Sequence, residues 1–375
     1  MPEKKLRDFS VKVVDLFCGI GGLTHGFIKE SLDVVAGYDI DSDCKYAYEA
    51  NNKNSDGKIS EFIDKSIIDV TADEISAKFA DADVKILIGC APCQPFSTYS
   101  YKNQDEIKIN LLLEFARLIE EVKPDIVSME NVPRLAEFDG DSVFGQFIEI
   151  LKTNGYEVTY QIVYCPEYGI PQHRKRLVLL ASRFGKIELI KKTHTEKKFK
   201  TVKDAIGKMP PLKSGEVSPK DSLHRATKLS ELNLKRIKQS VQGGTWKDWD
   251  EDLKLKCHLK TSGETYVSVY GRMSWDKPAP TMTTHCMGIG NGRFGHPEQD
   301  RAISLREAAL IQTFPRKYKF VEKGKPFTVK RISTRIGNAV PVKLGQIIAK
   351  SIKLHLSNPS VITKIENNFE SPESL

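Results

Sequence analysis

Long hydrophobic runs and paired cysteines are both missing from this sequence of 375 residues. No apolar stretch is long enough to span a membrane, and no signal peptide is recognisable. The seven cysteines lack the spacing of a disulfide framework, and Cys-x-x-Cys occurs only once, at Cys90 and Cys93. We therefore expect a protein of the reducing cytoplasm that has no metal site.

Length and composition set further bounds. A chain of 375 residues is too long for one typical core and predicts two domains. The net charge of +8 and the pI of about 8.9 suit a polyanionic partner without identifying it. From residue 11 to about residue 182, strand-like runs alternate with amphipathic segments, which predicts a doubly wound α/β sheet. Residues 185–300 break this pattern and indicate a second, smaller domain.

A strand-like run, a glycine-rich turn and a helix-like stretch follow one another near the N-terminus. The run 11–17 leads into Cys18-Gly19-Ile20-Gly21-Gly22, and glycines there let the backbone approach a ligand closely. A second strand-like run ends at Asp39, where an acidic residue is placed to bind ribose hydroxyls. The turn lacks the full dinucleotide fingerprint, so an adenosine-containing cofactor and a purely structural turn both stay open.

Cys93 follows a third strand-like run, residues 84–89. Open α/β sheets bind their ligands at the C-terminal ends of the strands. Pro92 and Pro95 restrict the backbone on either side and would hold the thiol in one orientation. The position suits a nucleophile, and a buried cysteine that acts as a small hydrophobe is the alternative.

Two further segments place polar side chains beside predicted strands. Glu130 comes at the end of the apolar run 125–129, where its carboxyl group can meet Cys93 across the neighbouring strand end. Along an extended segment alternate residues share one face, so we expect Gln172, Arg174 and Arg176 to point the same way.

Together these segments resemble the cytosine-5 DNA methyltransferase family, in its bacterial restriction–modification form. The resemblance runs over most of the chain, and six motifs come in the family's order. They are the cofactor loop at 15–23, Pro92-Cys93-Gln94, Glu130-Asn131-Val132, Gln172-x-Arg174-x-Arg176, a late helix at 306–315, and Gly337-Asn338-Ala339-Val340-Pro341.

The resemblance implies an S-adenosyl-L-methionine-dependent, Rossmann-like catalytic domain over 1–183 and a smaller, irregular target recognition domain over 184–300. Residues 301–356 would return to the catalytic domain, and 357–375 would form a flexible tail. An adenine contact after the third strand would fall on Ser66 or Asp69. The cofactor-binding residues implied are Phe17, Gly19, Gly21, Gly22, Asp39, Ile40, Pro92, Leu111, Asn338 and Val340.

The family resemblance also gives the catalytic roles. Cys93 would attack C6 of cytosine, because a thiolate is strongly nucleophilic. Glu130, as the protonated acid, would contact N3 and the exocyclic amine, and Arg176 would contact O2. Arg174 would clamp a phosphate or help to position Cys93, and Gln172 would support the pair. The cytosine would be flipped out of the duplex, with residues 95–109 as a mobile loop that closes over the DNA.

Basic and glycine-flanked positions in the expected recognition domain are the candidates for DNA contact. Arginine is the commonest reader of guanine, whereas most lysine and arginine contacts go to phosphates. His224 lies in the same basic cluster. The candidates are Ser97, which precedes that domain, and Arg225, Lys228, Arg236, Thr245, Arg272 and Arg293.

Two other functions stay open. An RNA-directed relative would keep every catalytic motif, although the Cys-Phe-Thr signature of that branch does not occur in this sequence. A non-catalytic DNA-binding relative would be expected to lose the thiol or the acid, whereas Cys93, Glu130 and Arg176 are all present. As partners we expect double-stranded DNA and a separately acting restriction endonuclease. We expect a monomer, in the bacterial cytoplasm at the nucleoid.

Overall fold

The computed structural model describes residues 5–92, 106–137, 142–263 and 267–370. The chain divides into two compact units: the first is Met1–Val163, Lys175–Lys191 and Leu344–Leu375, and the second is Tyr164–Arg174 and Lys192–Lys343. The strands are β1 (Val11–Leu16), β2 (Asp33–Asp39), β3 (Glu61–Asp64), β4 (Val84–Gly89), β5 (Ile126–Asn131), β6 (Glu157–Tyr164), β7 (Gln172–His173), β8 (Lys175–Ser182), β9 (Val217–Ser218), β10 (Asp221–Arg225) and β11 (Ala279–Pro280). The helices are α1 (Gly22–Lys29), α2 (Lys45–Glu49), α3 (Ala72–Lys78), α4 (Glu106–Val122), α5 (Val143–Thr153), α6 (Val202–Ile206), α7 (Glu231–Gln239), α8 (Leu305–Ile311), α9 (Val329–Asn338), α10 (Val342–Leu356) and α11 (Pro359–Glu370).

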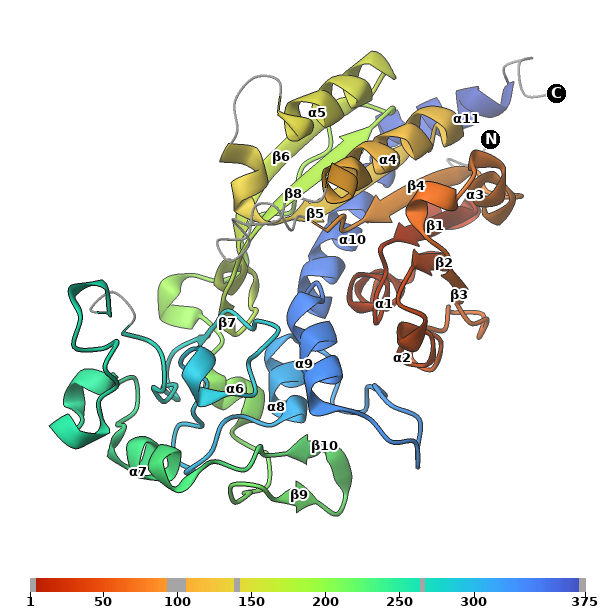
Figure 1. The fold of residues 1–375 in the computed structure, drawn as a ribbon. Helices are drawn as coiled ribbons and strands as arrows, with labels where there is room; N and C mark the ends of the chain where they lie inside the picture. The colour runs from red at the N-terminus through yellow and green to blue at the C-terminus, as the bar shows by residue number, and fades with distance from the viewer. Residues whose placement is uncertain (1–4, 93–105, 138–141, 264–266, 371–375) are drawn as a thin grey trace. The chain divides into compact units, whose positions relative to one another are not determined.

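A seven-stranded sheet in the order β3-β2-β1-β4-β5-β8-β6 forms the centre of the first unit (Figure 1). Strands β3, β2, β1, β4 and β5 pair in parallel, and β8 runs antiparallel to β5. The central strands β4 and β5 are almost completely buried, as is usual for parallel strands that helices cover on both faces. The doubly wound α/β fold expected from the sequence is therefore confirmed.

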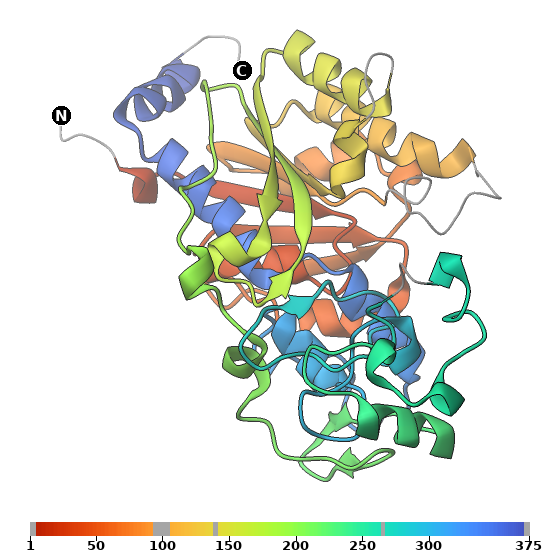
Figure 2. The ribbon, with the colours of Figure 1, turned by 90° about the vertical axis from the view of Figure 1, so that its left-hand side faces the viewer.

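Helices cover both faces of this sheet. Side chains alternate between the faces along each strand, and Val14 and Leu16 of β1 share one core with residues of α3, α4 and α5. Helices α1 and α10 lie on the other face (Figures 1 and 2). There Gly345 of α10 is so near α1 that a Cβ would lie 2.8 Å from the carbonyl oxygen of Leu23. With both faces covered, the strand ends are where ligands can approach.

The winding of the chain reverses between β1 and β4. From β1 the chain winds outward through β2 to β3 and then returns to β4, on the other side of β1. Leu16 pairs with Gly89, so the segments that follow β1 and β4 leave the sheet side by side. Open α/β sheets bind their ligands at such a reversal, which locates the candidate site of the first unit.

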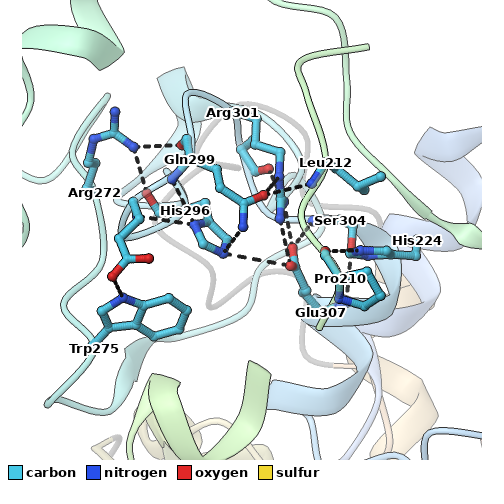
Figure 3. A network of polar contacts seen from close by, with 12 residues as sticks. Pro210, Leu212, His224, Arg272, Trp275, His296, Gln299, Arg301, Ser304 and Glu307 are labelled. Atoms are coloured by element: carbon cyan, nitrogen blue, oxygen red, sulfur yellow. Dashed lines mark hydrogen bonds and ion pairs between the residues drawn. The ribbon is translucent and has the colours of Figure 1, made fainter. Parts of the chain in front are cut away.

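The second unit holds its short elements together with buried polar contacts (Figure 3). Arg301 and Glu307, both fully buried, form a two-point ion pair with N–O distances of 2.7 and 2.8 Å. The backbone amide of Ser304 donates to the same carboxylate, and its hydroxyl lies 2.9 Å from Nδ1 of His224. Because Nε2 of His224 faces the carbonyl oxygen of Pro210 at 2.8 Å, that nitrogen donates and Nδ1 accepts. His224 is thus a structural residue of this unit.

Parts of the expected domain organisation differ from the structure. Helices α8 and α9 belong to the second unit, and the return to the first unit begins at Leu344 rather than near residue 301. Residues 359–370 form α11 where a flexible tail was expected, because Val361 and Ile365, one helical turn apart, are buried. Which residues serve as the recognition domain stays a prediction.

Among the residues that the structure describes, no helix is both long enough and apolar enough to cross a membrane.

Asp15, the penultimate residue of β1, is a carboxyl group buried beneath the glycine-rich turn. Its Oδ2 accepts a hydrogen bond of 2.5 Å from the hydroxyl of Thr24, and Oδ1 has no hydrogen-bond partner among the described residues. Burial raises the pKa of Asp15 from 3.8 to about 7, and the nearby negative charge of Asp39 acts in the same direction. Below about pH 7 the folded protein therefore holds Asp15 mainly in its neutral form.

We expect the contribution of Asp15 to stability to fall as the pH rises from about 4 to about 7. The folded state keeps a proton that the unfolded chain releases above pH 3.8, so this contribution is complete below pH 3.8 and lost near pH 7. In urea unfolding, the free energy of unfolding of wild type should fall relative to that of Asp15→Asn by about 1.4 kcal/mol for each pH unit in this range.

The surface variant Asp56→Asn is the matched control. Backbone and side-chain hydrogen bonds from Lys58 lower the pKa of Asp56, so any slope it produces has the opposite sign. A difference between wild type and Asp15→Asn that stays constant from pH 4 to pH 8 would show that Asp15 ionises normally.

Candidate functional site

The turn after β1 needs three residues in the left-handed region. Phe17, Gly19 and Gly21 have φ angles of 60°, 50° and 80°. Glycine adopts this conformation without strain, whereas Phe17 is held there by its surroundings. The amide of Cys18 donates to the carbonyl oxygen of Tyr38 on β2 at 3.0 Å, which fixes the start of the turn. The turn leads directly into α1, which begins at Gly22 and ends at Lys29, near which the sequence predicts the end of a helix.

Asp39 ends β2 beside this turn. Its Oδ2 accepts a hydrogen bond of 2.7 Å from the amide of Gly19, and its Oδ1 accepts one of 2.9 Å from the amide of Asp41. A Cβ on Gly19 would lie 3.9 Å from Oδ2 and would narrow the space in front of the carboxylate. The carboxylate is therefore fixed against the turn, and its contact with a ribose stays a prediction.

Three other predicted cofactor residues lie in the first unit and two in the second. Ile40, next to Asp39, is 74% exposed, Pro92 is exposed after β4, and Leu111 is half-buried on α4. Asn338, exposed at the end of α9, and the buried Val340 belong to the second unit. Contact of these five residues with a cofactor stays a prediction.

A buried acid and an arginine meet at the end of β5. Glu130 is only 2% exposed, and its Oε1 lies 3.0 Å from Nε of Arg176, at ion-pair distance but outside hydrogen-bond alignment. Arg176 comes from β8, the antiparallel neighbour of β5, and its Nη1 donates to the carbonyl oxygen of Lys175 at 2.7 Å. The guanidinium group thus lies beside a buried carboxyl group at the edge of the sheet.

Cys90 and Asn131 complete this group, and the sequence analysis missed both. Gly89 pairs with Met129, so the next residues along β4 and β5, Cys90 and Glu130, are also neighbours. The thiol of Cys90 donates to Oε2 of Glu130 at 2.9 Å. The buried amide of Asn131 donates to the carbonyl oxygen of Ala91 at 3.0 Å, which fixes the chain two residues before Cys93. The sequence carries no signal for the contact of Cys90 with Glu130, because it depends on the register of β4 against β5.

Residues 93–105 lie outside the described residues. They include Cys93, Ser97 and most of the segment expected to close over DNA.

The predicted common face of Gln172, Arg174 and Arg176 is divided between the two units and stays a prediction. Gln172 and Arg174 belong to the second unit and Arg176 to the first, because the chain passes from β7 to β8 between them. The buried Gln172 contacts Gln312 at 2.6 Å, and Nη1 of Arg174 donates to the carbonyl oxygen of Met282 at 3.0 Å. A phosphate clamp does not fit Arg174, which is only 2% exposed and binds carbonyl oxygens.

Two predicted DNA-contacting arginines are also structural. Arg236 is buried, with Nε donating to the carbonyl oxygen of Leu253 at 2.9 Å. Arg272 is 5% exposed, donates to carbonyl oxygens that include Ser240 at 2.8 Å, and pairs with Asp300. Buried guanidinium groups whose donors are used inside the unit cannot also reach a base edge, so the structure gives both arginines a different role.

The remaining DNA-contact candidates are more accessible. Lys228 is exposed, and Arg225 is half-buried with its guanidinium 5.2 Å from the centre of the Phe327 ring. Thr245 caps a short 3₁₀ helix at Trp246–Asp248 by accepting from the amide of Lys247 at 3.1 Å. Arg293 is half-buried, and its Nε has no hydrogen-bond partner among the described residues. DNA contact by these residues stays a prediction.

Comparison with known proteins identifies relatives over nearly the whole chain. The Type II methylase M.HgiDII of Herpetosiphon aurantiacus is 56% identical over 344 residues, which cover 92% of this chain and 95% of the relative. The Type II methyltransferase M.PspPI of Psychrobacter sp. (strain TA137) is 32% identical and covers 92% of this chain and 79% of the relative.

A solved structure supports the fold. A candidate DNA modification methyltransferase encoded within an E. coli prophage has a TM-score of 0.70 at 22% identity, covering 93% of this chain and 100% of that one. The model of the family described as C-5 cytosine-specific DNA methylase matches residues 11–354. The resemblance seen in the sequence motifs is therefore confirmed, and the chain belongs to the C-5 cytosine-specific DNA methylase family.

Proposed function

We propose that the protein transfers a methyl group from S-adenosyl-L-methionine to C5 of a cytosine flipped out of a specific double-stranded DNA sequence. Membership of the family and the Type II methylases among its relatives support this activity. We further propose that it acts as a monomer in the bacterial cytoplasm, as the modification partner of a restriction endonuclease that binds the same sequence separately.

The observation that carries the proposal is the buried pair of Glu130 and Arg176, 3.0 Å apart on β5 and β8, with Glu130 also bonded to Cys90, three residues before Cys93 in the chain. The Watson–Crick edge of cytosine presents O2, N3 and the exocyclic amine side by side. An arginine donor beside a carboxyl group matches that order, with Arg176 at O2 and Glu130 at N3 and the amine. A buried site of this kind admits only an unstacked base, which requires base flipping.

The chain's own residues then carry the covalent chemistry. The Cys93 thiolate forms a bond to C6, and the electrons of the C5–C6 double bond move toward N3 and O2. Glu130, as the protonated acid, gives its proton to N3, Arg176 stabilises the charge at O2, and the proton returns to Glu130 as C5 forms its bond to the methyl group. C5 becomes nucleophilic and accepts the methyl group. Loss of the C5 proton to a base then restores the double bond and releases Cys93 as a thiolate.

The turn after β1 supplies a fitting place for the methyl donor. Phe17, Gly19, Gly21 and Gly22 would surround it, and Asp39 would bind its ribose beside Ile40. When bound, the donor supplies an electrophilic methyl group on a sulfonium centre. Pro92, Leu111, Asn338 and Val340 are proposed as further contacts, and Ser66 or Asp69 as the adenine contact.

We expect Asp39→Ala to weaken S-adenosylmethionine binding about 10- to 100-fold, because hydrogen bonds to a charged group contribute about 1.5–3 kcal/mol. Isothermal titration calorimetry measures the change without depending on turnover. Asp56→Ala, which removes a carboxylate from the surface of the same unit, should bind like wild type. Equal affinities for Asp39→Ala and wild type would place the ribose elsewhere.

The covalent step can be tested with duplex DNA that carries 5-fluorocytosine at the methylated position. Fluorine cannot leave C5 as a proton, so wild-type protein with S-adenosylmethionine should accumulate a denaturant-resistant protein–DNA adduct. Cys93→Ser should form none and should lose methyl transfer by at least a thousandfold, because a hydroxyl is hardly ionised at neutral pH.

Cys90→Ser is the matched control, since it changes the other cysteine of the same Cys-x-x-Cys and keeps a donor for Glu130. This variant should still form the adduct. An adduct that persists in Cys93→Ser and disappears in Cys90→Ser would show that Cys90, and not Cys93, is the nucleophile. An adduct with RNA but with no DNA duplex would replace the proposal with the RNA-directed alternative. DNA binding without an adduct on either substrate would favour the non-catalytic relative.

A further inference from the structure

A basic groove of about 630 Å³ lies within the second unit. Four segments line it: the turn at Gly215, the end of β10 with the residues after it, the loop that contains His285 and Asn291, and the first turns of α9. None of the described residues that line it is acidic. The basic or uncharged polar side chains that matter here are Arg225, Thr227, Lys228, His285, Asn291 and Lys330.

Within the described residues, the cations of this groove have no carboxylate partners. No ion pair in the described part of the chain includes Arg225, Lys228 or Lys330. Lys228 and Lys330 are exposed, and Arg225 lies over the ring of Phe327. Three positive side chains from two separate segments therefore face the same space without internal neutralisation, an arrangement that favours an anionic ligand.

The walls of the groove are held in place by contacts beneath it. On one side, the hydroxyl of Ser333 in α9 donates to the carbonyl oxygen of Thr284 at 2.8 Å. On the other, the hydroxyl of Ser214 accepts from the amide of Leu229 at 2.8 Å. His224, next to Arg225, is fixed by the buried network of Figure 3. The basic side chains are thus mounted on a backbone that needs little rearrangement on binding.

We propose that this groove binds the sugar–phosphate backbone of the duplex DNA outside the recognised bases, with Lys228 and Lys330 contacting phosphates; the proposal rests on the proposed function. The groove is larger than one phosphate group requires, and its cations come from separate segments, which suits successive phosphates of a strand. Lysine is a point charge with no fixed fork, so it suits phosphate oxygens rather than a bidentate base edge. The groove therefore contributes affinity and register, and the sequence is read elsewhere.

The test uses the full-length double variant Lys228→Gln/Lys330→Gln and a labelled duplex that carries the methylated sequence. We expect log Kobs to depend less steeply on log [KCl], by about 0.9 per lost contact or nearly 2 in all, and affinity at 0.1 M salt to fall roughly tenfold. The charge-keeping variant Lys228→Arg/Lys330→Arg should restore most of the slope.

Lys197→Gln/Lys198→Gln is the charge-matched control, because both lysines are exposed in the same unit and neither lines the groove. It should leave the slope within about 0.5 of wild type. The Gln double variant should also methylate the same DNA sequence as wild type.

An unchanged salt slope in the Gln double variant, with its melting temperature kept, would overturn the proposal. Methylation that spreads to new sequences would overturn the phosphate assignment in favour of base reading. Wild-type protein that binds and methylates RNA but no DNA would instead overturn the proposed function, so the two failures are distinguishable.

Discussion

The ion pair between Glu130 and Arg176 is the constraint on which the active-site end of the first unit depends. Glu130 is 2% exposed, and its nearest opposite charge in the described ion pairs is Arg176, which comes from β8, the antiparallel neighbour of β5. The antiparallel β8 thus does more than extend the sheet. It places a cation at the edge of the sheet where three other strands end. There β1 leads into the turn after Leu16, β4 leads into Cys90, and β5 carries Glu130.

Buried polar side chains have different roles in the two units. In the first unit, Asp15 and Glu130 are buried near the ends of strands β1 and β5, where ligand contact is proposed. The oxygen Oδ1 of Asp15 has no hydrogen-bond partner among the described residues. In the second unit the pair Arg301–Glu307 is closed on itself, and burial lowers the pKa of His296 to about 4, so that this imidazole stays neutral. The buried polar groups of the first unit can therefore interact with a ligand. Those of the second unit bind one another and fix the backbone that carries accessible cations such as Lys228.

The sequence predicted the fold of the first unit well, because its signals are local. Apolar runs gave β1, β4 and β5, and the glycines after β1 marked a turn whose left-handed residues the structure contains. Cys90 was missed, since only the register of β4 against β5 shows that it faces Glu130. Arg174 was misjudged as a phosphate clamp, because an extended stretch of sequence carries no sign that this side chain is buried and binds the carbonyl oxygen of a residue as distant as Met282. Arg236 and Arg272 were misjudged because burial of an arginine depends on distant carbonyl oxygens.

The central claim is that this protein methylates C5 of cytosine in DNA through the site formed by Cys93, Glu130 and Arg176. Base-resolution mapping of 5-methylcytosine in DNA and RNA from cells that express the protein tests it most directly. The account predicts 5-methylcytosine at one fixed position of one short DNA sequence, with none in cells that express Glu130→Gln. Unmodified DNA together with new 5-methylcytosine in transfer RNA, or DNA methylation that survives Glu130→Gln at the wild-type level, would contradict it.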